Sequence, residues 1–291
     1  MPVHHNIHSL PAFTKPVITI GTFDGVHLGH VEILRQLCNE AQSIDGTAIV
    51  ITFYPHPRQV IEKNEPIFIL NTPDEKYALL LKHGVEHIIC VPFEPSFYNQ
   101  TAKAYIENFL VEKFHPHTII IGYDHKFGSN REGGYHLLEE AALQYGFVVK
   151  EIPEHVLQNV VISSTRIREA LKNGDIESAN DFLGYHYFLS GNVVNGKRIG
   201  RTLGYPTANL KVQDEAKLIP SLGIYAVFVR LANDRTLYQG MLSIGTNPTL
   251  GGAATTIEVN IFEFNKDIYG ELLTLYFVKK LRNEEKFDNL Q

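Results

Sequence analysis

Two histidines spaced three residues apart carry the clearest chemical signal in this sequence. His27 and His30 lie in the segment Gly21-Thr22-Phe23-Asp24-Gly25-Val26-His27-Leu28-Gly29-His30, where an apolar run leads through glycines into a helical pattern. Residues three apart share one face of a helix, so both imidazoles can point at one ligand. The start of a helix also presents backbone N–H groups to phosphates. We therefore predict a site for nucleotide phosphates, with His27 and His30 as catalytic groups and a binding turn formed by Gly21, Thr22, Phe23, Asp24 and Gly25.

The histidines are needed because the rest of the turn contributes too little. A helix dipole stabilises a bound anion by about 0.3–1 kcal/mol, whereas a preorganised donor aimed at developing charge contributes about 2.7–4 kcal/mol. Two other interpretations stay open, a pair of helix-capping histidines and a zinc pair. Zinc would need further ligands at plausible spacing. The remaining candidates stand singly or in a strand pattern, at Cys38, Cys90, His115 and His117.

A second polar segment, residues 191–209, lies in the C-terminal third of the chain. Its glycines would let a loop lie close over phosphates, and basic side chains such as Lys197 and Arg201 offer positive charge. The alternative is a hairpin followed by an ordinary polar turn. Glycine-rich loops are weak signals when taken alone.

Glu258 is the third chemical candidate. It stands in an alternating strand pattern, on the face opposite Ile257 and Val259. A glutamate on a strand is usually just solvated. A carboxylate close to a substrate hydroxyl can nevertheless accept its proton during phosphoryl transfer, a contribution of about 10²–10⁴-fold.

Strand and helix patterns alternate through the first half, which is typical of a parallel α/β sheet. Thr72 can cap one helix in a capping box with Glu75, and Gly84 can end it. The pattern over Tyr135–Tyr145 also predicts a helix, which Gly146 can end. We predict a doubly wound, Rossmann-like sheet of order 3-2-1-4-5, with strands at Val17–Gly21, Thr47–Phe53, His87–Val91, His117–Gly122 and Phe147–Ile152.

In that strand order the loops after the first and fourth strands are neighbours, where ligands bind. Asp124 follows the fourth strand and would face the phosphate turn, although an ordinary turn aspartate is the simpler interpretation. A third segment combines hydroxyls at a helix start with arginines, which can hold phosphates, although solvated arginines on a capped helix are the alternative. Its candidate residues are Ser163, Ser164, Thr165, Arg166 and Arg168.

The pattern changes after two further helices that end near Leu171 and Leu183, the second followed by Gly184 as a cap. From Tyr187 onward apolar residues alternate, which predicts a small antiparallel barrel. Asn195-Gly196 favours a tight hairpin. We therefore predict two domains, residues 1–184 and 185–291. The barrel strands are expected at Gly223–Leu231, Thr236–Ile244, Thr256–Phe264 and Glu271–Val278.

Composition agrees with a two-domain folded protein. The chain has 291 residues, and its apolar content of 44% is ordinary for such a protein. A net charge of -6 with no basic stripe argues against a nucleic-acid binder. Two cysteines do not suggest a disulfide framework. The sequence shows neither a signal-peptide pattern nor an apolar run long enough for a membrane span, so we expect a cytoplasmic protein.

Several motifs resemble one known family in sequence and order. The 21–30 turn and the segment Ile162-Ser163-Ser164-Thr165-Arg166-Ile167-Arg168 resemble the bacterial bifunctional riboflavin kinase/FMN adenylyltransferase, or FAD synthetase, family. Between them, Thr52-Phe53-Tyr54-Pro55-His56-Pro57 is similar to the same family. In the second half, Gly200-Arg201-Thr202-Leu203-Gly204-Tyr205-Pro206-Thr207-Ala208-Asn209 resembles the riboflavin kinase signature.

The resemblance implies roles for particular residues. In the first domain it implies that the 21–30 turn, Asp124 and the 163–168 segment bind ATP for adenylyl transfer. It implies flavin contacts at Pro57 and Arg282. In the second domain it assigns Glu258 as the base and Mg²⁺ binding to Thr207 and Asn209. The kinase ATP site would be formed by Gly196, Lys197, Gly200, Arg201, Thr207 and Asn209.

The activity implied is ATP-dependent phosphorylation of riboflavin to FMN, followed by adenylylation of FMN to FAD with release of pyrophosphate. Mg²⁺ would serve both steps. The partners would be riboflavin, FMN, FAD, ATP and ADP, without nucleic acid or membrane. One rival is a related transferase for phosphopantetheine or nicotinamide mononucleotide with a regulatory barrel, against which Glu258 argues. The other is a flavin-binding sensor without catalysis, against which His27, His30 and Thr207 argue.

Overall fold

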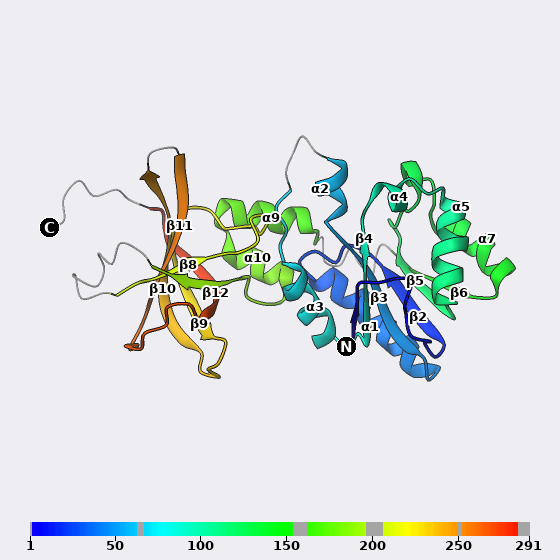
Figure 1. Cartoon of the computed structure of the whole chain (residues 1–291), viewed down its shortest axis with the longest axis horizontal. Coiled ribbons are helices and arrows are strands. Elements are labelled where there is room, and N and C mark those ends of the chain that lie inside the picture. Colours follow the sequence, from blue (N-terminus) through cyan, green and yellow to red (C-terminus); the bar gives the residue numbers. More distant parts are fainter. Residues whose placement is uncertain (1, 63–66, 154–161, 196–205, 250–251, 285–291) are drawn as a thin grey trace. The chain divides into compact units, whose positions relative to one another are not determined.

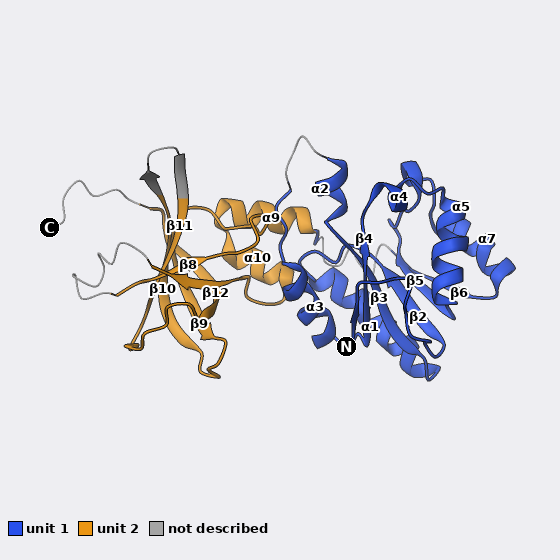
Figure 2. Ribbon diagram, in the orientation of Figure 1, with its two compact units in different colours: residues 1–163 blue, residues 164–291 orange. Residues whose placement is uncertain are grey.

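The chain folds into two compact units, Met1–Ser163 and Ser164–Gln291, shown as a computed structural model in Figures 1 and 2. The structure describes residues 2–62, 67–153, 162–195, 206–249 and 252–284. Each unit is described by itself below. The division falls after Ser163, so the two helices that follow it group with the barrel.

Unit 1 is built on a parallel sheet of order β1-β4-β3-β2-β5-β6, in which every neighbouring pair is parallel. The predicted order of the five longer strands is confirmed. Strand β1 was not predicted, because two residues are too few to carry a hydrophobic period. The strands are β1 Val3–His4, β2 Pro16–Ile20, β3 Thr47–Tyr54, β4 His87–Pro92, β5 Thr118–Gly122 and β6 Val148–Ile152.

The helical segments of unit 1 connect these strands, and α1 packs against β2, β3 and β5. The predicted capping box is confirmed: Thr72 accepts from the Glu75 N–H and Glu75 accepts in return from the Thr72 N–H. Gly146, with φ +77°, ends α7 as predicted. The segments are α1 Leu28–Ser43, α2 Pro57–Ile61, α3 Pro73–Lys82, α4 Pro95–Tyr98, α5 Ala102–Ala104, the π-helix η1 Tyr105–Val111, α6 Glu112–Phe114, the 3-10 turn η2 Ser129–Arg131 and α7 Tyr135–Tyr145.

The core of unit 1 lies along the central strands. All five residues of β2 are buried, as expected for a parallel strand covered on both faces. Aliphatic residues of β3, β4 and β5 pack with aromatic residues of the π-helix such as Tyr105 and Phe109. This buried frame holds the carboxyl ends of β2 and β5 side by side, where the predicted site residues follow.

Unit 2 begins with helices α9, Ser164–Asn173, and α10, Ile176–Leu183, and Gly184 caps α10 with φ +75° as predicted. Six antiparallel strands then form a closed barrel in the order β10-β11-β8-β7-β12-β9. The predicted fold class, a Rossmann-like domain with an antiparallel barrel, is confirmed. The strands are β7 Phe188–Val194, β8 Ala208–Lys211, β9 Gly223–Leu231, β10 Tyr238–Thr249, β11 Gly252–Ile261 and β12 Leu272–Arg282.

The tight hairpin predicted at Asn195-Gly196 falls partly outside the described residues. Val194, the last residue of β7, pairs with Asn209 on β8.

Within the described ranges, no helix is both long and apolar enough to cross a membrane.

Candidate functional site

The turn between β2 and α1 is tight and held on both sides. The Gly21 N–H donates to the Ile51 carbonyl at 3.0 Å, which fixes the turn to β3. Gly25 has φ +87°, and the non-glycine residues Phe23 and Val26 have φ +49° and +35°. Left-handed backbone at such residues persists only where packing enforces it, and both side chains are almost fully buried. The turn is therefore a preorganised structure.

His27 and His30 meet at the first turn of α1. Their rings are stacked, with centroids 3.7 Å apart and an interplanar angle of 16°. His27 is also the N-cap of α1: its Nδ1 accepts from the His30 N–H at 3.3 Å. The capping interpretation thus holds for His27, and it is compatible with ligand binding. With Nδ1 accepting, a neutral His27 carries its proton on Nε2, which can donate to a phosphate.

His30 is kept uncharged by its surroundings. Burial, with further contributions from His27 and Lys76, holds the pKa of the His30 imidazole well below its usual range. Its Nδ1 is buried without a hydrogen-bond partner among the described residues. The Phe23 ring lies 5.1 Å from the His30 ring, centroid to centroid. A buried polar atom of this kind is costly unless a ligand satisfies it.

Asp24 is directed at the protein backbone. Its Oδ1 accepts from the N–H groups of Leu70 at 2.9 Å and Asn71 at 3.3 Å, and the residue is 4% exposed. The carboxylate thereby ties the turn to the segment before α3. Its predicted role in ATP binding stays a prediction, as do those of Gly21, Thr22, Phe23 and Gly25.

Sequence reasoning missed a lysine beneath this turn. Lys76 is 8% exposed, and its Nζ donates to the Thr22 carbonyl, to Thr52 Oγ1 and to the Phe53 carbonyl at 3.2, 2.9 and 3.5 Å. The signal that could have found it is its spacing, since Lys76 lies one helical turn before the buried Leu80, on the apolar face of α3.

The loop after β5 places Asp124 at the carboxyl edge of the sheet, next to the strand that leads into the phosphate turn. Asp124 is exposed, whereas the neighbouring His125 packs inward, 5.9 Å from Phe127 between ring centroids. Burial is the main cause that lowers the pKa of His125 to about 4; Asp124 opposes this effect and Arg131 adds to it. Asp124 thus follows the strand that pairs with β2, as the strand order predicted, and its role in ATP binding stays a prediction.

The other residues predicted for the adenylyltransferase site come from α2 and from the segment at the division between the two units. Pro57 is the first residue of α2, whose N-cap is His56. Ser163 ends unit 1, and α9 of unit 2 begins at Ser164 with Arg168 7% exposed. Each assignment stays a prediction, including those of Ser164, Thr165, Arg166 and Arg168.

In the barrel, the structure brings three predicted residues together. Thr207 Oγ1 donates to Glu258 Oε2 at 3.2 Å. Asn209 on β8 is directly opposite Glu258 on β11, so the two side chains share one face of the barrel wall. A further contact was not anticipated: Asn260 Nδ2 donates to the Pro206 carbonyl at 2.8 Å, next to Thr207 and just before β8.

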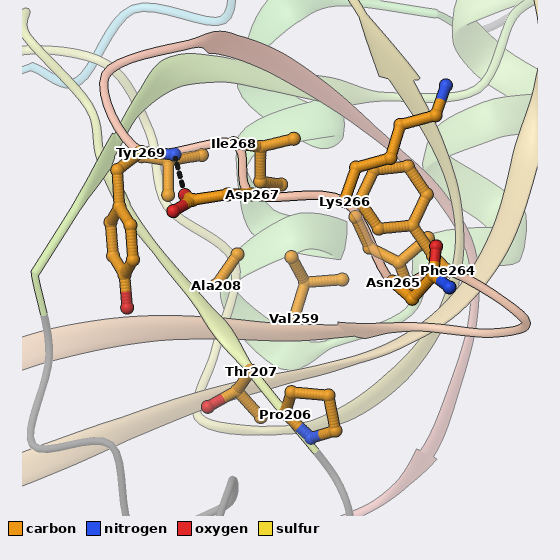
Figure 3. Close-up of a pocket in the computed structure, with 12 residues that line it drawn as sticks. Pro206, Thr207, Ala208, Val259, Phe264, Asn265, Lys266, Asp267, Ile268 and Tyr269 are labelled. Carbon is orange, nitrogen blue, oxygen red and sulfur yellow. Dashed lines mark hydrogen bonds between the residues drawn. The ribbon is translucent and has the colours of Figure 1, made fainter.

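A cavity of about 320 Å³ adjoins Thr207 (Figure 3). Its floor is apolar, with Ala208 and Val259 from neighbouring strands, and residues 264–269 form the other side. Figure 3 shows Asp267 and Tyr269 across the cavity from Thr207, with the Tyr269 N–H donating to Asp267 Oδ1 at 3.2 Å. The cavity can take a flat ring system whose polar end lies near Thr207.

Among the described residues predicted for the kinase site, Thr207 lines this cavity, whereas Asn209 and Glu258 do not. Arg282 ends β12, and it is not one of the residues that line the cavity. The remaining four, predicted for ATP binding, lie outside the described residues: Gly196, Lys197, Gly200 and Arg201.

Comparison with known families matches both units. A family model described as FAD synthetase matches residues 11–166, and one described as riboflavin kinase matches residues 183–291.

Curated relatives match along nearly the whole chain. A bifunctional riboflavin kinase/FMN adenylyltransferase of Haemophilus influenzae is 39% identical over 93% of this chain and 87% of its own. The Escherichia coli K12 protein of the same name is 35% identical to this chain, and the match covers 98% of this chain and 90% of that protein. A solved structure, described as a macrolide-efflux protein from Streptococcus pneumoniae, has a TM-score of 0.87 at 32% identity and covers 99% of this chain and 93% of its own.

Proposed function

The chain belongs to the bifunctional riboflavin kinase/FMN adenylyltransferase family, and on that premise we propose that it makes FMN from riboflavin in the barrel and FAD from FMN in the N-terminal unit. One observation in each unit carries the proposal. In unit 1 it is the stacked pair of His27 and His30 at the start of α1. In unit 2 it is the contact between Thr207 and Glu258 beside the cavity.

In the adenylyl transfer, an FMN phosphate oxygen attacks the α-phosphate of ATP and pyrophosphate leaves. The His27 Nε2–H and the backbone N–H groups at the start of α1 are donors for the charge that develops on the phosphates. His30 stacks against His27 and limits its rotation. Because the turn is already held by Gly21 and Asp24, these donors need little rearrangement when ATP binds.

In the kinase, Glu258 accepts the proton of the riboflavin 5′-hydroxyl as that oxygen attacks the γ-phosphate of ATP. Thr207 donates to Glu258 and so fixes the carboxylate orientation before the substrate arrives. The adenine of ATP lies in the neighbouring cavity, because the phosphate-binding Thr207 lines it and its floor is apolar.

The side chains near Glu258 suit Mg²⁺. A threonine hydroxyl, an asparagine amide oxygen and a carboxylate are oxygen donors, which is the ligand type that Mg²⁺ prefers. Thr207 and Asn209 would hold the ion with ATP, where it would neutralise phosphate charge.

We also propose that residues 1–184 form the adenylyltransferase domain and residues 185–291 the kinase domain. The riboflavin kinase match from residue 183 supports this boundary, whereas α9 and α10 group with the barrel by their contacts. A cytoplasmic location is proposed because both reactions consume ATP.

The proposal is tested by incubating the purified chain with riboflavin, ATP and Mg²⁺ and separating the flavins by chromatography. FMN should form first and FAD after it. Riboflavin that stays unchanged would refute the kinase assignment. Added FMN that is not converted to FAD would refute the adenylyltransferase assignment and favour a barrel attached to a different transferase.

A further inference from the structure

Lys76 is a buried charge to which neither proposed reaction assigns a role. Its ammonium has three protons, and three oxygens accept from it: the Thr22 carbonyl, Thr52 Oγ1 and the Phe53 carbonyl. Thr52 Oγ1 also donates to the Thr22 carbonyl at 3.1 Å. A buried lysine is stable as a cation only with such a complete set of acceptors. The ammonium therefore joins the phosphate turn to the end of β3.

The charge of Lys76 is balanced within the same turn. Burial lowers the pKa of the Lys76 ammonium, and the carboxylate of Asp24 acts in the opposite direction. Asp24 in turn accepts from the backbone at Leu70 and Asn71, just before α3. Lys76 on α3 thus binds the turn through the Thr22 carbonyl, and Asp24 within the turn binds the backbone just before α3.

Lys76 also acts on the histidine pair. The groups whose charge lowers the pKa of the His30 imidazole are His27 on the same helix and Lys76 on α3. A positive charge that reaches His30 also reaches anions bound at the start of α1, because the low dielectric of the interior screens it little.

We propose that Lys76 is a positioning residue for adenylyl transfer: its ammonium fixes the Thr22 carbonyl against the end of β3 and places a positive charge beneath the turn that binds the ATP phosphates. This inference rests on the function proposed for unit 1.

Lys76→Met removes the charge and the three donors while keeping most of the side-chain volume. FAD formation from supplied FMN should fall about 10²-fold, the effect of a misplaced reacting group, with a higher KM for ATP. FMN formation from riboflavin should be unchanged and shows that the barrel is folded. Lys82→Met, the same substitution at the exposed end of α3, should leave both reactions unchanged. FAD formation at the parental rate in Lys76→Met would overturn the proposal.

The protonation of His30 supplies a readout that does not depend on turnover. In Lys76→Met the midpoint of the His30 imidazole titration, followed by NMR with His30→Gln to assign the signal, should move upward. An unchanged midpoint would show that the charge does not act on the site and would overturn the proposal. This measurement stays decisive if the parental chain makes no FAD, a result that would refute the proposed function instead.

Thr52→Val provides the second variant if Lys76→Met fails to fold. It keeps the ammonium but removes the hydroxyl that binds both Lys76 and Thr22. We expect FAD formation to fall about tenfold, the loss of one hydrogen bond to a charged group, while the His30 midpoint stays at the parental value. Parental FAD formation in Thr52→Val would overturn the positioning role.

Discussion

The two sites are built in opposite ways. In unit 1 the reactive side chains come from one short segment, where His27 and His30 are three residues apart on the start of α1. In the barrel, Thr207 and Glu258 are 51 residues apart and meet only because β8 pairs with β11. The side chains of the first site are therefore close in sequence, and the buried Lys76 and Asp24 hold the turn that carries them. The second is set by strand register, so its geometry depends on the whole barrel.

Among single substitutions, the largest expected effect on the barrel reaction is that of Glu258→Gln, which removes the base and leaves unit 1 intact. FMN formation from riboflavin should fall by about 10²-fold or more, because an amide cannot accept the hydroxyl proton. FAD formation from supplied FMN should stay at the parental rate. Chromatography of the flavins measures both. Glu215→Gln, on an exposed part of unit 2, is the matched control. Parental FMN formation in Glu258→Gln would mean that Glu258 is not the base.

A buried histidine should make unit 1 sensitive to acid. The folded chain holds His125 uncharged, with a pKa of about 4, whereas the unfolded chain protonates it near pH 6.5. The unfolded state therefore binds more protons as the pH falls, and the free energy of unfolding drops below pH 6.5. Between pH 7 and pH 5 the loss from His125 is about 2 kcal/mol.

His125→Phe should remove that part of the pH dependence. Hydrogen exchange of the β5 amides at pH 7 and pH 5 measures the free energy of opening. His136→Phe, whose parent side chain is 93% exposed, is the control and should keep the parental pH dependence. An equal drop in His125→Phe and the parental chain would show that His125 does not carry the effect.

The smallest expected effect is that of Thr207→Val, which tests how far strand register alone positions Glu258. Loss of the hydroxyl removes one hydrogen bond to the carboxylate and one of the groups proposed to hold Mg²⁺, so FMN formation should slow at least about tenfold. Thr207→Ser restores the hydroxyl and should restore most of the rate. If the valine variant were as fast as the parent, cross-strand pairing would orient Glu258 without help. Steady-state kinetics of riboflavin phosphorylation decide between the two.

The contrast between the sites also explains what sequence reasoning could reach. The capping box at Thr72 and the αL cap at Gly146 depend on local patterns, and they are confirmed. The pair of His27 and His30 is local as well. These features need no knowledge of contacts between distant segments.

Features that depend on distant contacts were missed. Lys76 looks like an ordinary helix residue until α3 packs beneath the turn. Asp24 lies within the predicted binding turn, and the hydrogen bond that its carboxylate accepts from the Leu70 N–H, 46 residues away, was not anticipated. In both cases tertiary hydrogen bonding determined the outcome.

The most direct test of two independent sites is the flavin product of the double variant His27→Ala with His30→Ala. Given riboflavin, ATP and Mg²⁺, this protein should make FMN at the parental rate and stop there. FAD formation should fall at least about 10³-fold, because the variant loses the His27 donor and the His30 ring that orients it. Equal loss of both reactions would contradict the account, because the barrel would then depend on the histidine pair of unit 1.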